Sequence, residues 1–207
     1  MGKIVIFDFD GTIVDSMPRL ADIAAGLINR YYGLSSKISR DLYIMTSGAP
    51  FVEQIEYMFP GKKENSEIVE EFERRKESEL MNEPLFPGTK EALAALAERG
   101  NKIVISSSNF QHLMEAYIKE QGLAPDLVLG HKEGFSKGKD HFDYIKTHLR
   151  ADTDDLVFVG DSLRDLEKAG ENGVRFIGKI GTFTADEFRE AGAAEVIHDL
   201  KELVDIL

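Results

Sequence analysis

The chain has 207 residues, 43% of them hydrophobic, which is enough to bury a sizeable core in one or two domains. Its formal net charge of -12 argues against a nucleic-acid or membrane-surface partner, because both need a basic patch. We find no apolar run near the ~20 residues of a membrane span and no signal-peptide pattern, so we expect a cytoplasmic protein. We expect it to be either a monomer or a homodimer. The absence of cysteine excludes disulfides, thiolate zinc sites and a cysteine nucleophile.

The chain begins with an apolar run, residues 3–7, which is typical of a strand buried on both faces of a parallel sheet. Asp8, Asp10 and the turn residue Gly11 follow it directly. Side chains two apart on a strand share a face, so the two acids are expected to lie together at the strand's carboxyl end. Neighbouring carboxylates repel unless a cation or a shared proton compensates them, so the pair indicates a metal ion or an acid/base couple. The same residues also suit an ordinary solvated turn.

Residues 17–84 contain no strand candidate and are predicted to form an all-helical insertion. Apolar side chains recur there at helical spacing, and Gly33 ends the first helix. A polar stretch at 46–50 and a Pro60-Gly61 turn separate the later helices. The predicted helices are 18–32, 51–59 and 64–82.

After residue 84, predicted strands and helices alternate, which indicates parallel strands joined by right-handed crossovers. We therefore expect an α/β fold with a doubly wound, mostly parallel, Rossmann-like sheet. Residues 1–16 and 85–207 would form this core, with residues 17–84 as a separate helical domain. The predicted strands are 102–106, 126–129, 156–159, 174–177 and 195–197, and the predicted helices are 87–99, 109–121, 139–149, 163–170, 184–191 and 199–206.

Polar residues follow the first four predicted strands, where ligands of an open doubly wound sheet bind. Each signal alone has an ordinary explanation, since serine and asparagine cap helices, a lone lysine lies on the surface, and Gly-Asp forms turns. All four in this order indicate a functional site. The signals are Asp8 with Asp10, residues 106–109, Lys137, and residues 160–165.

Four stretches carry a resemblance to a known family: Asp8-Phe9-Asp10-Gly11-Thr12, Ser106, Lys137 and Gly160-Asp161-Ser162-x-x-Asp165. They resemble the four motifs of the haloacid dehalogenase-like hydrolase superfamily, over the whole chain. The resemblance implies a Rossmann-like core with a helical cap, and it is greatest to small-molecule phosphatases related to phosphoglycolate phosphatase.

Three positions separate this chain from particular relatives. Haloacid dehalogenases lack the second aspartate, which Asp10 supplies here, so dehalogenation is not expected. The β-phosphoglucomutase-like relatives usually have Glu-Asp where this chain has Gly160-Asp161. The phosphatase relatives usually have Lys-Pro where this chain has Lys137-Gly138.

Phosphoryl transfer needs an in-line nucleophile, a cation over the phosphate oxygens and a proton donor for the leaving alkoxide. Asp8 is expected to attack phosphorus and form an aspartyl phosphate, and Asp10 to protonate the leaving oxygen and then activate water. Mg²⁺, which prefers oxygen ligands, is expected to bind Asp8, the backbone carbonyl of Asp10, and Asp161. Asp165 would support these ligands directly or bind the ion through a water molecule.

Ser106, Ser107 and nearby backbone amides are expected to bind the phosphoryl oxygens, while Lys137 neutralises their charge. Lys139 is the competing lysine. The apolar stripe of its helix turns Lys139 toward the solvent edge, whereas Gly138 lets the start of the helix lie close to the sheet. We therefore assign the phosphate contact to Lys137.

The sequence thus predicts a Mg²⁺-dependent phosphomonoesterase that acts on a small-molecule phosphate ester. The cap would select the substrate, and Thr46, Ser47, Gly48 and Asn109 are the candidate hydrogen-bonding residues. A phosphomutase of the same superfamily is one alternative. A non-catalytic phospho-accepting signalling module is another, although ~120 residues would suffice for it and it would need no helical cap.

Overall fold

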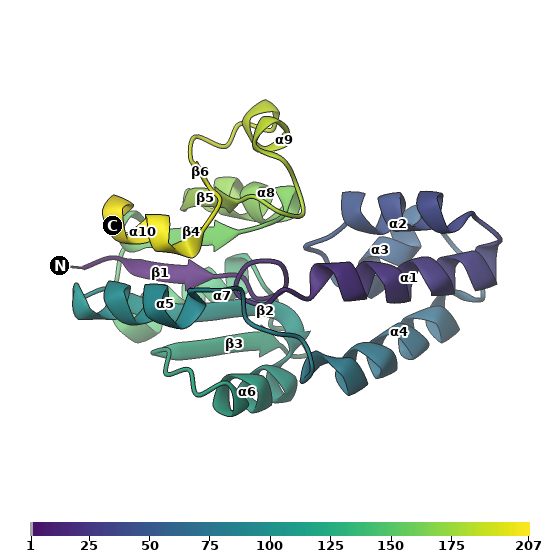
Figure 1. The fold of residues 1–207 in the computed structure, drawn as a ribbon, viewed down its shortest axis with the longest axis horizontal. Helices are drawn as coiled ribbons and strands as arrows, with labels where there is room; N and C mark the ends of the chain where they lie inside the picture. The colour runs from purple at the N-terminus through teal and green to yellow at the C-terminus, as the bar shows by residue number, and fades with distance from the viewer. Residues whose placement is uncertain (1) are drawn as a thin grey trace.

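The computed structural model describes residues 2–207, and its centre is a six-stranded sheet of order β3-β2-β1-β4-β5-β6 (Figure 1). Every pairing between neighbouring strands is parallel. The predicted α/β, doubly wound, Rossmann-like fold is therefore confirmed. The strands are β1 (Ile4–Phe7), β2 (Lys102–Phe110), β3 (Leu127–His131), β4 (Leu156–Gly160), β5 (Arg175–Lys179) and β6 (Val196–Ile197).

Helices cover both faces of the sheet because its central strand is apolar on both sides. Val5 and Phe7 of β1 face one apolar cluster, whereas Ile4 and Ile6 face the other, as the two-residue alternation of a strand requires. Side chains of α5, α6 and α10 complete the first cluster, and those of α7, α8 and α9 complete the second. None of the helices within residues 2–207 is long and apolar enough to cross a membrane. The bounds are α5 (Thr89–Glu98), α6 (Gln111–Glu120), α7 (Lys139–Leu149), α8 (Leu163–Glu171), α9 (Ala185–Glu190) and α10 (Leu203–Ile206), with 3₁₀ turns at Thr153–Asp155 and Leu200–Glu202.

The four helices between β1 and α5 pack around an apolar cluster of their own, and we call residues 17–80 the helical insertion. Figure 1 shows it beyond the arrowheads of the strands. Its two connections to the sheet lie side by side, since Asp15 N donates to Pro84 O at 2.9 Å. The insertion therefore stands over the carboxyl ends of the strands. Its helices are α1 (Met17–Tyr32), α2 (Ser36–Met45), α3 (Phe51–Met58) and α4 (Asn65–Leu80).

Helix α2 was not predicted from the sequence. Its buried side chains are only Ser39 and Tyr43, while Ile38 and Met45 are exposed, so no apolar stripe marks it. The hydroxyl of Ser35 caps it by accepting from Ile38 N. The structure thus adds one helix to the insertion without adding a strand.

The predicted end of the second strand was wrong. Strand β2 continues to Phe110, which pairs with His131 of β3 after a register irregularity, and α6 therefore begins at Gln111 rather than at residue 109. The backbone amide of Asn109 donates to Ser107 Oγ at 3.1 Å within this irregular segment. Local side-chain hydrogen bonding thus replaces the expected first turn of the helix.

Candidate active site

The strand order brings together acids that are far apart in the sequence. The chain builds the sheet outward from β1 in one direction and from β4 in the other, so the switch point lies between these strands. Asp8 follows β1 and Asp161 follows β4. The amide of Asp8 donates to Val159 O at 2.8 Å, which extends the pairing of the two strands to the first acid.

Gly11 forms the turn that follows Asp8 and Asp10, and its lack of a side chain allows this turn to lie against Asp161. Its φ of 76° is in the left-handed region, and a Cβ at this position would lie 2.0 Å from Asp161 Oδ2. The buried Lys179 of β5 donates to Gly11 O at 3.1 Å, so the turn is also held from the sheet. A side chain at Gly11 would therefore displace the carboxylate of Asp161.

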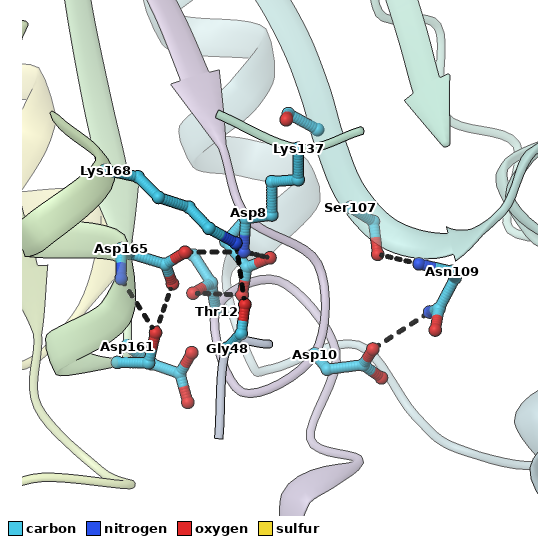
Figure 2. Close-up of polar contacts among 12 residues, drawn as sticks. Asp8, Asp10, Thr12, Gly48, Ser107, Asn109, Lys137, Asp161, Asp165 and Lys168 are labelled. Carbon is cyan, nitrogen blue, oxygen red and sulfur yellow. Dashed lines mark hydrogen bonds and ion pairs between the residues drawn. The ribbon is translucent and has the colours of Figure 1, made fainter. Parts of the chain in front are cut away.

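Lys137 connects the acids of the first and fourth motifs (Figure 2). Its Nζ lies 2.5 Å from Asp8 Oδ1 and 2.6 Å from Asp165 Oδ1. The side chains of Lys137, Asp8 and Asp165 are only 3%, 7% and 0% exposed, so water hardly screens these ion pairs. Lys139 instead pairs with Asp143 on the exposed surface of α7. The structure therefore places Lys137, and not Lys139, among the acids.

Asp8, Asp161 and Asp165 each present one carboxylate oxygen so that the three atoms lie within 4.8 Å of one another. Burial raises the pKa of Asp8 to about 6, although Lys137 opposes this change. Burial, followed by the charges of Asp8 and Asp165, raises the pKa of Asp161 well above its usual value. One lysine cannot neutralise three buried carboxylates, so an all-oxygen donor set with surplus negative charge suits a hard divalent cation.

Asp10 lies outside that cluster and has partners of its own. Its Oδ1 accepts from Ser16 Oγ at 2.6 Å, and its Oδ2 accepts from Asn109 Nδ2 at 2.9 Å. Lys76 Nζ, from α4 of the helical insertion, lies 4.0 Å from Oδ2. The side chain of Asp10 is 18% exposed, compared with 7% for Asp8, so its carboxylate is the more accessible of the two.

The neighbouring serines of β2 have different hydrogen-bond partners. Ser106 Oγ lies 2.8 Å from Nδ1 of His141 in α7, and both residues are fully buried. Burial, followed by the charge of Lys137, lowers the pKa of His141 to about 3, so this imidazole is neutral. Ser107 Oγ accepts from Asn109 N, and Figure 2 shows it between Lys137 and Asn109. The hydroxyl of Ser106 is therefore engaged by His141, whereas the hydroxyl of Ser107 lies next to Asn109.

A cavity of about 50 Å³ lies between the acids and the helical insertion. Asp8, Asp10, Asp161 and Lys137 line it from the sheet, and Lys76 lines it from the insertion. The other side chains that the insertion contributes are mostly apolar or aromatic: Met17, Leu20, Tyr43, Phe51 and Phe72.

Two of the three predicted substrate residues of the insertion reach this cavity. Ser47 and Gly48 line it, and Ser47 Oγ is buried without a hydrogen-bond partner among residues 2–207. Thr46 does not, because its Oγ1 donates to Leu42 O and contacts Gln54 Oε1, both at 2.9 Å. Thr46 lines a larger cavity of about 840 Å³ on the other side of the 46–49 loop. The aspartates of the site do not line this larger cavity: Asp8, Asp10, Asp161 and Asp165.

Sequence reasoning missed Lys76. It lies in the row formed by Ile68, Phe72, Lys76 and Leu80, whose spacing of four residues puts them on one face of α4. The other three are buried apolar side chains. A lysine within an apolar row was therefore the signal that could have identified it.

Sequence reasoning also missed Lys168, which follows Asp165 by three positions on α8. Its Nζ donates to Gly48 O at 3.0 Å (Figure 2). Burial, followed by the charge of Lys137, lowers the pKa of Lys168 to about 8. Its place near the fourth motif gave no sign of this contact, because the partner belongs to the helical insertion.

Comparisons with known proteins agree with this geometry. A family model described as haloacid dehalogenase-like hydrolase matches residues 5–179. Phosphoglycolate phosphatase of Synechococcus elongatus is 26% identical and aligns over 83% of this chain and 81% of that protein. Phosphoserine phosphatase of Campylobacter jejuni subsp. doylei is 26% identical and aligns over 100% of this chain and 99% of that protein. A solved haloacid dehalogenase-like family hydrolase from Streptococcus pneumoniae shares the fold, with a TM-score of 0.83 and 17% identity over 99% of this chain and 98% of that one.

The doubly wound sheet and the carboxylate cluster at its switch point define an α/β enzyme. The chain belongs to the haloacid dehalogenase-like hydrolase family, as the match over residues 5–179 shows. Both named relatives above are phosphatases.

Proposed function

We propose that this protein is a Mg²⁺-dependent phosphomonoesterase that hydrolyses a small phosphorylated metabolite through an aspartyl phosphate on Asp8. The observation that carries the proposal is the convergence of Asp8, Asp161 and Asp165 around Lys137 at the switch point. Such a cluster can both attack phosphorus and bind a cation. The phosphatase relatives support the same reaction class.

The reaction has two steps. In the first, a carboxylate oxygen of Asp8 attacks phosphorus, the bond from phosphorus to the ester oxygen breaks, and Asp10 gives its proton to that oxygen. In the second, Asp10 takes a proton from water, whose oxygen attacks phosphorus and displaces Asp8. Inorganic phosphate and free Asp8 result. Lys137 Nζ, 2.5 Å from the nucleophile, would hold the phosphoryl oxygens in both steps, with the hydroxyl of Ser107 as a second donor.

Asp8, Asp161 and the backbone carbonyl of Asp10 would hold Mg²⁺, with Asp165 beside them. When bound, the ion supplies the positive charge that lets an anionic phosphate approach four carboxylates. The hydrogen bonds from Ser16 and Asn109 hold the carboxylate of Asp10 in place without Lys137, and this orientation would present it to the leaving oxygen.

The helical insertion would act as the cap that selects the substrate, in a division of the chain into a core of residues 1–16 and 85–207 and a cap of residues 17–84. The 50 Å³ cavity is far smaller than the ~300–1,000 Å³ of ligand pockets, so the insertion must move away before a substrate enters. Lys76 and Ser47, which line the cavity from the insertion, are then the residues that meet the non-reacting part of the substrate.

The test is hydrolysis of p-nitrophenyl phosphate and of a panel of metabolite phosphate esters, each with Mg²⁺ or with excess chelator. We expect release of inorganic phosphate only with the metal, and full activity in chelator would contradict the proposed cofactor. Release of inorganic phosphate also distinguishes hydrolysis from a phosphomutase, which would return an isomeric ester.

The nucleophile is tested by trapping the phosphoenzyme. Acid-quenched wild type should contain a base-labile phosphoprotein, and Asp8→Asn should contain none because an amide is a poor nucleophile. Asp15→Asn is the matched control, since Asp15 is a nearby but exposed acid outside the cluster. Phosphoprotein at wild-type level in Asp8→Asn would overturn the assignment.

A further inference from the structure

Lys168 joins the sheet core to the helical insertion directly above the acids. Its ammonium donates to the backbone carbonyl of Gly48 at 3.0 Å (Figure 2). Within residues 2–207, it is the only hydrogen bond from a side chain of α8 to the insertion, and its donor is charged. A charged donor makes it stronger than a neutral contact of the same length.

The lysine reaches Gly48 by passing over Gly138, at the start of α7. Gly138 has a φ of 112°, in the left-handed region, and a Cβ there would lie 3.4 Å from Lys168 Cγ and Cδ. A proline at this position would need a φ near about −65° and could not adopt this backbone. The Lys137-Gly138 pair therefore has a structural reason in the left-handed backbone at Gly138, whereas a Cβ there would only be in ordinary van der Waals contact with the stem of Lys168.

The Gly48 backbone lies even closer to its neighbours in the core. Its φ is 87°, and a Cβ would lie 2.2 Å from Ser162 Oγ and 3.0 Å from Arg164 Cβ. Ser162 Oγ donates to Asp165 Oδ2 at 2.7 Å. The backbone of the insertion at Gly48 therefore packs directly against Ser162, whose hydroxyl orients Asp165.

We propose that Lys168 is a positioning residue whose bond to Gly48 O holds the helical insertion closed over Asp8 and Asp10, a contact that we call the Lys168–Gly48 latch. The role of closure in turnover rests on the proposed phosphatase function, but the latch itself does not. Closure brings Lys76 to within 4.0 Å of the accessible carboxylate of Asp10 and narrows the cavity to about 50 Å³, so loss of the latch should affect substrate binding and catalysis together.

The first experiment needs no substrate. Hydrogen–deuterium exchange is measured on the full-length protein for peptides covering residues 46–50, in wild type, in Lys168→Met and in the control Lys139→Met, whose lysine is exposed on α7. We expect faster exchange at 46–50 in Lys168→Met alone, with far-UV circular dichroism unchanged, and Lys168→Arg, which keeps a charged donor, should restore part of the protection. Unchanged exchange at 46–50 in Lys168→Met would overturn the latch, whether or not the protein proves to be a phosphatase.

The second experiment separates the latch from direct substrate binding. We expect Lys168→Met to lose about tenfold or more in kcat/KM, the counterpart of one charged hydrogen bond, with both kcat and KM affected. A raised KM with wild-type exchange would show that Lys168 binds substrate instead, and would overturn the proposal. If Lys168→Met does not fold, Lys168→Gln decides, because it replaces the charged donor with a shorter neutral one: it should exchange faster than wild type at 46–50, and wild-type protection there would contradict the latch.

Discussion

Replacement of Lys137 by alanine tests the centre of the site most directly. Its ammonium lies 2.5 Å from Asp8 and 2.6 Å from Asp165, and all three side chains are buried. Removal of one partner of a buried ion pair leaves the other charge uncompensated, which costs about 3–5 kcal/mol of folding free energy. Loss of a preorganised donor to the phosphoryl oxygens should lower kcat by ~10²–10³-fold in addition. Lys139→Ala is the matched control, because Lys139 is two positions away and pairs with Asp143 on the surface.

Steady-state kinetics with p-nitrophenyl phosphate and saturating Mg²⁺ give kcat for both variants, and urea unfolding gives their stabilities. The kinetic assay is run at a temperature where circular dichroism shows Lys137→Ala to be folded, so that lost structure is not read as lost chemistry. We expect Lys139→Ala to match wild type in both assays. A larger loss of kcat in Lys139→Ala than in Lys137→Ala would refute the reasoning, because it would mean that the start of α7 presents the other lysine to the site.

Three further predictions use the same preparations. Asp10→Asn should lose ~10²-fold or more of kcat yet, unlike Asp8→Asn, still yield phosphoprotein from an aryl ester with a good leaving group, as rapid quenching would show. The pKa of His141, about 3, lies below its ordinary 6.5, so between these values the unfolded chain binds more protons and stability falls as the pH drops. At about pH 5, which is 1.5 pH units below 6.5, the free energy of unfolding should fall by about 2 kcal/mol, at ~1.4 kcal/mol per unit. Urea unfolding at pH 7.5 and at pH 5 should show this loss in wild type but not in His141→Asn. An equal pH effect in both proteins would contradict the burial argument. Lys76→Met should change KM between phosphate esters more than it changes kcat on the aryl ester, with exposed Lys63→Met as control, and loss of all hydrolysis in a folded Lys76→Met would make the insertion catalytic.

The sequence by itself determined the sheet and the place of the site on it. The apolar run before Asp8, the turn residue Gly11 and the strict alternation after residue 84 are local patterns, and local patterns specify strands, turns and crossover direction. The positions of Asp8 and Asp161 after their strands then followed from the rule for doubly wound sheets. Even the choice of Lys137 over Lys139 needed only the period of one helix. Helix α2 escaped this reasoning because its buried face carries Ser39 and Tyr43 rather than an apolar stripe.

Only the tertiary structure decided which side chains meet within the site. Ser106 and Ser107 are adjacent and chemically identical, yet one hydroxyl lies at His141 and the other at Asn109, because successive residues of a strand point to opposite faces and the register with β3 shifts there. Lys76 and Lys168 reach the site from α4 and α8. The apolar row of α4 marks Lys76 as unusual without naming its partner, and nothing local marks Lys168. Their contacts depend on how the helical insertion docks on the sheet, and docking is set by long-range packing that no local pattern encodes.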